Sequence, residues 1–281
     1  MREKITAFFT KGILFIVAIP AIVLPLLCIG YIFLKGIGAI NIDLFMGNYS
    51  PAEQYSMAGG DGIKGEITGT LLLALLSTTM ALPLAIGLAC WHNLSANKKM
   101  RRTVTAILHL LQGLPPLVVG LCALLLLVLW LKWGISLLAG AVVLAVIVFP
   151  IMVIIFIHAI ERIPKGQLES ARSLGLGEFD VITRVWLPVA WPHMLTGILL
   201  AMARSMAETA PILFTAVVFS GIDWPSSIFE PVTSLQTHIF FLAQEAVDER
   251  SMDVAWGSGL VLVLMTLSLT MVSSFMRRFY K

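Results

Sequence analysis

The chain has 281 residues, of which 58% are hydrophobic and only 12% are charged. A soluble domain of this size carries about 25% charged residues, so the composition excludes a large soluble domain and indicates an integral membrane protein in contact with lipid. The net charge of +3 is small and gives no indication of nucleic-acid binding. We therefore expect an all-α, polytopic protein with a single transmembrane domain over residues 1–281.

Six apolar stretches are long enough to cross roughly 30 Å of hydrocarbon as helices. They lie near residues 12–34, 66–91, 104–131, 134–158, 194–219 and 255–276. The first has no small-residue cleavage pattern at its end, so we interpret it as a retained anchor rather than a signal peptide. Several stretches contain proline or glycine, and the carbonyls that these residues free must face protein or a water-filled path.

Lys and Arg are distributed unevenly between the loops. Fourteen of the nineteen lie in the two terminal segments and in the loops near 92–103 and 159–190, whereas four lie in the opposite loops. Because positively charged loops stay in the cytoplasm, this asymmetry predicts that both termini are cytoplasmic. The 159–190 loop would then be cytoplasmic as well. The long external loop over 220–254 is acidic, and it is either a solvated face or a docking surface for an extracytoplasmic binding protein.

The 159–190 loop carries a long polar motif. It reads E-S-A-R-S-L-G from Glu169 to Gly175 and, after nine residues, V-W-L-P from Val185 to Pro188. An ordinary loop between helices with a solvated charged face is the simplest interpretation of such a stretch.

The local pattern predicts two short amphipathic helices within this loop. Pro164 suits the first turn of the first helix, and Gly175 suits the position just after its end. The second helix is expected to begin at Glu178 and to end at Pro188. Residues at helical spacing should share the packed faces of the two helices: Leu168, Ala171 and Leu174 in the first, and Phe179, Ile182, Val185 and Trp186 in the second.

The motif resembles the cytoplasmic loop of bacterial ABC importer permeases, which is written E-A-A, three residues, Gly, nine residues, I-x-L-P. Ser170 stands where that family usually has Ala, and Val185 stands where it usually has Ile. The resemblance implies a type I ABC importer permease fold in the bacterial inner membrane. It also implies contact with a separate ATPase through Glu169, Ala171, Gly175, Leu187 and Pro188. Because no G-x-x-x-x-G-K-[ST] pattern occurs, we expect no cofactor in this chain, and ATP-Mg would be bound by the partner ATPase.

The fifth apolar stretch contains two charges, Arg204 and Glu208, which are four residues apart and therefore share a face of a helix. Counted from Met194, they should lie near the middle of the membrane, where each charge costs about 2.5–3.5 kcal/mol on insertion scales. Two interpretations remain open. The pair either fixes helix packing as a buried ion pair, or forms an anion path in which Arg204 attracts the substrate and Glu208 positions it or gates the path.

A second resemblance concerns the same stretch. The pattern R-x-x-x-E-T-A-P from Arg204 to Pro211 resembles the phosphate importer permeases of the PstA type, with Ala207 where that family usually has Gly. Segments 59–71 and 113–120 agree with the same family, so the likeness covers roughly residues 59–220. It implies a translocation pathway that includes Arg204, Glu208 and Thr209. It also implies a second homologous permease subunit, two ATPase subunits and an extracytoplasmic phosphate-binding protein as partners.

Other functions are less consistent with the sequence. A permease for phosphonate, sulfate or molybdate differs only in substrate. A proton-coupled secondary transporter that uses Glu208 as its carrier leaves the loop motif unexplained. An intramembrane enzyme lacks a cluster of nucleophile and base, and the five histidines and three cysteines show no metal-ligand spacing, so no metal is expected.

Overall fold

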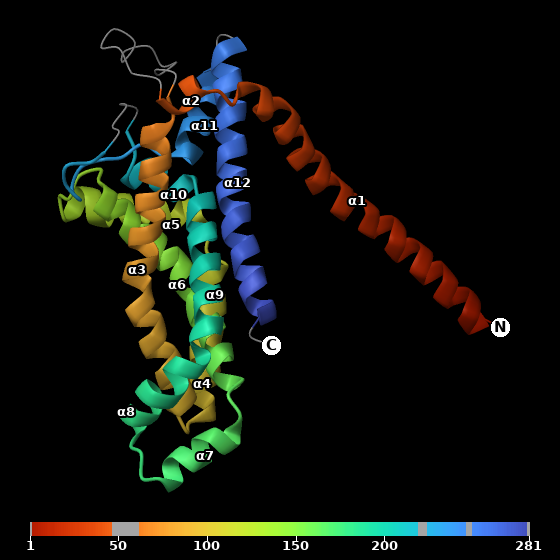
Figure 1. The fold of residues 1–281 in the computed structure, drawn as a ribbon, viewed down its shortest axis with the longest axis vertical. Coiled ribbons are helices and arrows are strands. Elements are labelled where there is room, and N and C mark those ends of the chain that lie inside the picture. Colours follow the sequence, from red (N-terminus) through yellow and green to blue (C-terminus); the bar gives the residue numbers. More distant parts are fainter. Residues whose placement is uncertain (1, 47–61, 219–223, 246–248, 280–281) are drawn as a thin grey trace.

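The computed structural model describes residues 2–46, 62–218, 224–245 and 249–279, and nearly all of them are helical (Figure 1). In chain order the elements are α1 (Arg2–Ala39), α2 (Ile42–Met46), α3 (Lys64–Leu94), α4 (Lys98–Gln112), α5 (Pro116–Ala123), the π-helix η1 (Leu124–Trp130), α6 (Leu137–Glu161), α7 (Lys165–Ser173), α8 (Glu178–Val181), the π-helix η2 (Ile182–Trp186), α9 (Leu187–Ala207), α10 (Ala210–Thr215), α11 (Leu235–Glu245) and α12 (Glu249–Phe279). The one β-type contact in this part of the chain is an isolated parallel bridge between Val217 and Val232. The all-α expectation is confirmed.

Among the described residues, five helical segments are long and apolar enough to cross a membrane. They are Leu14–Ala39, Lys64–Leu94, Leu137–Glu161, Glu178–Ala207 and Ser251–Arg278. A sixth span results if the bent pair formed by Lys98–Gln112 and Pro116–Trp130 is counted as one. Helices are favoured here because every backbone N–H and C=O must be satisfied within the segment in lipid.

The core lies where α3, α6 and α9 pack together (Figure 1). Small side chains recur every four residues along α3 and are buried against larger ones on α6. These are Ala81, Ala85 and Ala89 on α3, with Val148, Met152 and Phe156 on α6. On α9, a Cβ added to Gly197 would lie 2.8 Å from Cγ2 of Ile155, so only glycine permits this approach. Small residues at the contacts let the helix backbones come close, which is how helices associate in a membrane.

Helix α1 stands apart from this core. It leans away from the bundle and meets α12 only toward its C-terminal end (Figure 1). There the rings of Tyr31 and Trp256 meet edge-on with centroids 5.2 Å apart, and Gly36 packs against Leu260. The apolar side chains of α1 from Leu14 to Leu27 are largely exposed, which suits a surface that faces lipid.

The third apolar stretch differs from the expected span over 104–131. It consists of α4 and the α5–η1 segment, which meet at an angle of 89°. The break falls at Gly113, Leu114 and Pro115, just before Pro116 begins α5. Proline has no N–H to continue the α4 hydrogen bonds, and it restricts the residue before it, so the first helix must end here.

The fifth stretch also differs from its expected bounds of 194–219. A helical path runs from Glu178 through η2 into α9, and the N–H of Leu187 donates to the carbonyl of Ile182, five residues back. This wider π turn accommodates Pro188, which lacks an N–H, in the first turn of α9. The prediction that Pro188 ends the second amphipathic helix is therefore wrong, and that helix is the beginning of the fifth membrane helix.

Candidate translocation and coupling sites

Arg204 and Glu208 form an ion pair, with Nη2 of Arg204 2.8 Å from Oε1 of Glu208. The sequence had led us to expect the pair within one continuous helix over 194–219. The pair lies instead at the C-terminal end of α9. Glu208 caps the C-terminus of α9 with an extended backbone (φ −87°, ψ 118°), and a new short helix, α10, begins at Ala210. The break is explained by Pro211, which cannot donate to the carbonyl one turn back but suits the first turn of α10.

A side chain from α11 stabilises this helix break. Nε2 of Gln236, on α11, donates to the carbonyl of Met206 in the last turn of α9. Oε1 of Gln236 lies 3.2 Å from Oγ1 of Thr70 on α3, and Thr70 also accepts from the N–H of Leu235 at 3.0 Å. A second polar contact, 2.9 Å between the hydroxyls of Ser77 and Ser205, joins α3 to α9 in the last turn before the break. Buried polar groups thus hold the end of α9 that carries the ion pair.

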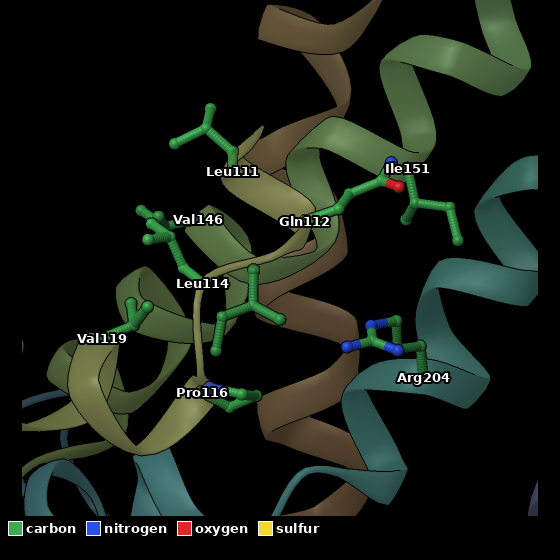
Figure 2. A pocket seen from close by; sticks show the side chains of 9 residues that line it. Leu111, Gln112, Leu114, Pro116, Val119, Val146, Ile151 and Arg204 are labelled. Atoms are coloured by element: carbon green, nitrogen blue, oxygen red, sulfur yellow. The ribbon is translucent and has the colours of Figure 1, made fainter. Parts of the chain in front are cut away.

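Arg204 faces a cavity of about 150 Å³ between α4, α5, α6 and α9 (Figure 2). Its lining consists of Leu111, Gln112, Leu114, Pro116, Val119, Val146, Ile147, Ile151 and Arg204. A water molecule occupies about 30 Å³ of liquid, so this space can hold a small anion with a few waters. The lining includes neither Glu208 nor Thr209, so the structure places only one of the three predicted pathway residues directly on the cavity.

Gln112 is the other polar side chain in this lining, and our sequence reasoning missed it. It is the last residue of α4, just before the Gly113–Pro116 break, and it lines the same cavity as Arg204 of α9 (Figure 2). Its signal in the sequence is a polar residue inside an apolar stretch, immediately before the Gly113–Pro116 break. A carboxamide offers donors as well as an acceptor, so it can help to bind an oxyanion without adding charge.

Exposure differs sharply within the ion pair. The side chain of Arg204 is 45% exposed, whereas that of Glu208 is 14% exposed. A guanidinium has five N–H donors, and the contact with Glu208 occupies only one side of it. Donors therefore remain available to a ligand in the cavity.

The 159–190 loop lies at the end of the bundle remote from α10 and α11 (Figure 1). Its first helix, α7, follows Pro164 as expected, and Gly175 has a left-handed backbone (φ +78°) just after the helix end. Ala171 is buried, Leu187 is half-buried, and Glu169 and Pro188 are exposed. Gly175 is exposed as well, so three of the five predicted coupling residues face outward, and one, Ala171, anchors α7 to the bundle core.

Two apolar side chains of this loop do not take the packed positions that the helical spacing predicted. Leu174 is 82% exposed and Phe179 is 76% exposed, whereas Trp186 is buried as expected. Gly175 separates these two residues and ends α7, so the chain turns outward between them. Both side chains therefore lie on the outer surface of the loop.

Membrane-length helices, with a bent helix pair beside a cavity that holds a guanidinium, are typical of a membrane transport protein. The chain belongs to the family of binding-protein-dependent transport system inner membrane components, which matches residues 81–281. It is therefore an ABC importer permease subunit and a multi-pass inner-membrane protein.

Curated relatives agree with this assignment. The phosphate transport system permease protein PstA of Xylella fastidiosa is 32% identical over 83% of this chain and 79% of its own length. A probable phosphate transport system permease protein PstA of Methanocaldococcus jannaschii is 33% identical over 74% of this chain and 73% of its own. The probable ABC transporter permease protein YqgI of Bacillus subtilis is 27% identical over 95% of this chain and 93% of its own. The resemblance to permeases of the PstA type is confirmed.

Solved structures support the fold. A bacterial ABC transporter that imports alginate matches 99% of this chain and 98% of its own, with a TM-score of 0.62 and 17% identity. The MetNI methionine ABC transporter matches 83% of this chain and 99% of its own, with a TM-score of 0.60 and 17% identity. At this identity the likeness concerns the fold alone, and the type I importer permease fold is confirmed.

Proposed function

We propose that this chain is the permease subunit of an ATP-driven phosphate importer and forms half of its translocation pathway. The observation that carries the proposal is the partly exposed guanidinium of Arg204 in the cavity beside the α9–α10 break. Relatives named as phosphate permeases share about a third of their residues with this chain and supply the choice of phosphate.

The transported anion would compete with Glu208 for hydrogen bonds from the guanidinium of Arg204. In the absence of substrate, Glu208 neutralises the guanidinium, which lowers the cost of a charge inside the membrane. An arriving phosphate accepts hydrogen bonds from the free donors of Arg204, and Gln112 supplies a neutral donor across the cavity. Thr209 begins the α10 segment next to Glu208, where its hydroxyl would join the path once the helices rearrange.

ATP hydrolysis would take place in two separate ATPase subunits, which bind ATP-Mg and meet this chain through the 164–188 loop. The exposed side chains of Glu169, Leu174 and Phe179 form the outer surface of that loop. A second homologous permease subunit would complete the pore, and an extracytoplasmic phosphate-binding protein would deliver the anion. The Lys and Arg distribution supports a topology in which both termini are cytoplasmic.

The test is uptake by the complete complex in proteoliposomes that contain ATP. We expect uptake of radiolabelled phosphate that unlabelled phosphate abolishes and that phosphonate, sulfate and molybdate leave largely unchanged. If one of those anions competed more strongly than phosphate, that anion and not phosphate would be the substrate. Transport by this chain without the ATPase subunits, abolished by an uncoupler, would instead support the proton-coupled alternative.

A further inference from the structure

A second cavity, of about 550 Å³, lies at the corner between the C-terminal end of α3 and the beginning of α4. It is on the end of the bundle that carries α7 and α8 (Figure 1). Its polar lining consists of His92, Lys98, Arg101, Arg102, Thr105 and His109. This set contains three permanent cations and two histidines, and no acidic residue lines the cavity.

The positive charge of this corner is only partly compensated. Arg101 pairs with Glu161 at 3.0 Å, but in the described residues no carboxylate is within 4 Å of Lys98 or Arg102. These cations lie at the N-terminus of α4, whose first turn contains no acidic residue. The N–H groups of a helix N-terminus carry partial positive charge, so cations there repel one another and the helix end. An external anion would relieve this repulsion.

His92 provides an independent indication of a ligand. Its side chain is buried, with 4% of the residue exposed, and Nε2 lies 3.2 Å from Oγ1 of Thr105. Nδ1, by contrast, has no hydrogen-bond partner among the described residues, although buried polar atoms almost always have one. Because the hydroxyl of Thr105 donates to the carbonyl of Arg101 at 3.0 Å, Nε2 of His92 donates to Thr105 and Nδ1 is an unpaired acceptor, to which a ligand hydroxyl can donate.

The other face of α4 is apolar. Met100, Ile107 and Leu110 are 51%, 49% and 73% exposed, and the helical repeat of 100° per residue places them mainly on the side away from Lys98 and Arg102. An amphipathic helix with Lys and Arg on its polar face is typical of helices that lie at a membrane surface and attract anionic lipids. Clusters of Lys and Arg next to membrane helices bind the headgroups of anionic lipids in this way.

We propose that the α3–α4 corner binds the headgroup of an anionic phospholipid. Lys98 and Arg102 would contact the phosphate oxygens, Nδ1 of His92 would accept a hydrogen bond from a headgroup hydroxyl, and the acyl chains would stay in the membrane, which the apolar face of α4 contacts. This inference does not depend on which anion the permease transports.

The experiment is native mass spectrometry of the purified full-length chain with added phosphatidylglycerol or phosphatidylcholine of the same acyl length. We expect the wild-type chain to retain phosphatidylglycerol preferentially. Because each cation near an anionic headgroup contributes roughly fivefold to binding, Lys98→Gln with Arg102→Gln should lose about 25-fold of that preference. Lys99→Gln is the matched control, since Lys99 lies in the same exposed turn but does not line the cavity.

Several results would overturn the proposal. Equal retention of the two lipids by the wild-type chain would do so, as would an undiminished preference in the double variant. An equal loss in Lys99→Gln would show that diffuse surface charge, not the cavity, selects the lipid. Displacement of the lipid by excess inorganic phosphate would indicate a site for the free anion. Loss of ATPase copurification with an unchanged lipid preference would identify a protein-docking surface instead.

Discussion

Arg204 and Glu208 differ in a way that separates the two interpretations of the pair. An ion pair that serves packing alone gains most when both partners are buried and fully hydrogen-bonded. Here the side chain of Glu208 is mostly buried, whereas the side chain of Arg204 is almost half exposed and lines a cavity. The geometry therefore favours contact with an anion, with Glu208 as the group that holds Arg204 in place.

Charge removal tests this interpretation. We expect the double variant Arg204→Gln with Glu208→Gln to lose phosphate uptake although it still assembles, because the anion loses its guanidinium. Arg204→Lys should retain part of the uptake, since a positive charge remains and the forked geometry is lost. Uptake in proteoliposomes and membrane abundance are the measurements. Substantial uptake by the assembled double variant would show that the pair is structural.

Gly175 is required for its backbone rather than for space. Its φ is +78°, and nothing lies within 4 Å of a Cβ built there. A side chain at this φ costs about 1–2 kcal/mol, most for a β-branched residue and least for asparagine. We predict that Gly175→Val abolishes ATP-driven uptake with normal membrane abundance, and that Gly175→Asn retains more uptake than Gly175→Val. Equal uptake by both variants and the wild type would contradict the role of this turn in coupling.

The elements most relevant to transport are the two interrupted helices, because their breaks meet at one place. A Cβ on Gly120 of α5 would lie 2.6 Å from the Cα of Pro211 in α10, so the segments after the two breaks are in close contact. Each break exposes backbone groups that need partners from elsewhere in the fold. At the end of α9 that partner is Gln236 of α11.

Loss of this partner should destabilise the chain. Gln236→Leu leaves the Met206 carbonyl without its donor, and an unsatisfied buried group costs about 1–3 kcal/mol. Thermal unfolding of the purified chain in detergent should shift to lower temperature, and uptake should fall. Gln244→Leu makes the same chemical change at an exposed position of the same helix and is the control. Equal midpoints for the two variants would show that the Met206 contact contributes nothing.

The contact of α3 with the segment before α11 offers a second test. A Cβ on Gly69 would collide with the carbonyl of Thr233, whereas nothing lies within 4 Å of one on Gly87 in the same helix. Gly69→Ala should lower the unfolding free energy by about 1–3 kcal/mol, as overpacking usually does. Gly87→Ala should be neutral or slightly stabilising, because alanine favours helix. The same unfolding measurement compares the stability of the two variants. An unchanged stability in Gly69→Ala would contradict the tight packing of this contact.

At the scale of the whole molecule, the fold has two distinct ends. One carries α7, α8 and the start of α4, and the other carries α2, α11 and the segment before it (Figure 1). The Lys and Arg distribution predicts that the first end is cytoplasmic. The described part of the acidic 220–254 segment, which the sequence predicts to be external, begins at the second end. Asp223 and Asp248 of that loop fall outside the described residues, and the carboxylate of Glu230 accepts from the N–H of Ser226 at 2.6 Å.

Thiol labelling in intact cells tests the orientation. With Cys28, Cys90 and Cys122 replaced by alanine, we expect Ser226→Cys to react with an impermeant reagent and Ala96→Cys to react only after the cells are opened. Both positions are exposed, so access to reagent and not burial determines the result. The reverse pattern would invert the topology and remove the 159–190 loop from the ATPase.

The sequence by itself determined the class of this protein. Apolar stretches of membrane length predict helices because lipid offers no partners for backbone groups, and the spaced motif from Glu169 to Pro188 identified the permease family. The presence of Arg204 and Glu208 in an apolar stretch marked the candidate site, because charges are costly there. These conclusions need only local composition and spacing along the chain.

Only the tertiary structure decided where the helices break and what surrounds the charges. Hydropathy does not reveal that the stretch around Gln112 bends by 89°, or that the helix carrying Arg204 ends at Ala207. Proline permits such breaks, but their position depends on partners that lie far away in the chain, such as Gln236 for the carbonyl of Met206. In the same way, Pro188 continues a helix because a π turn precedes it. Long-range contacts, which spacing along the chain does not encode, thus placed Gln112 and Arg204 on one cavity.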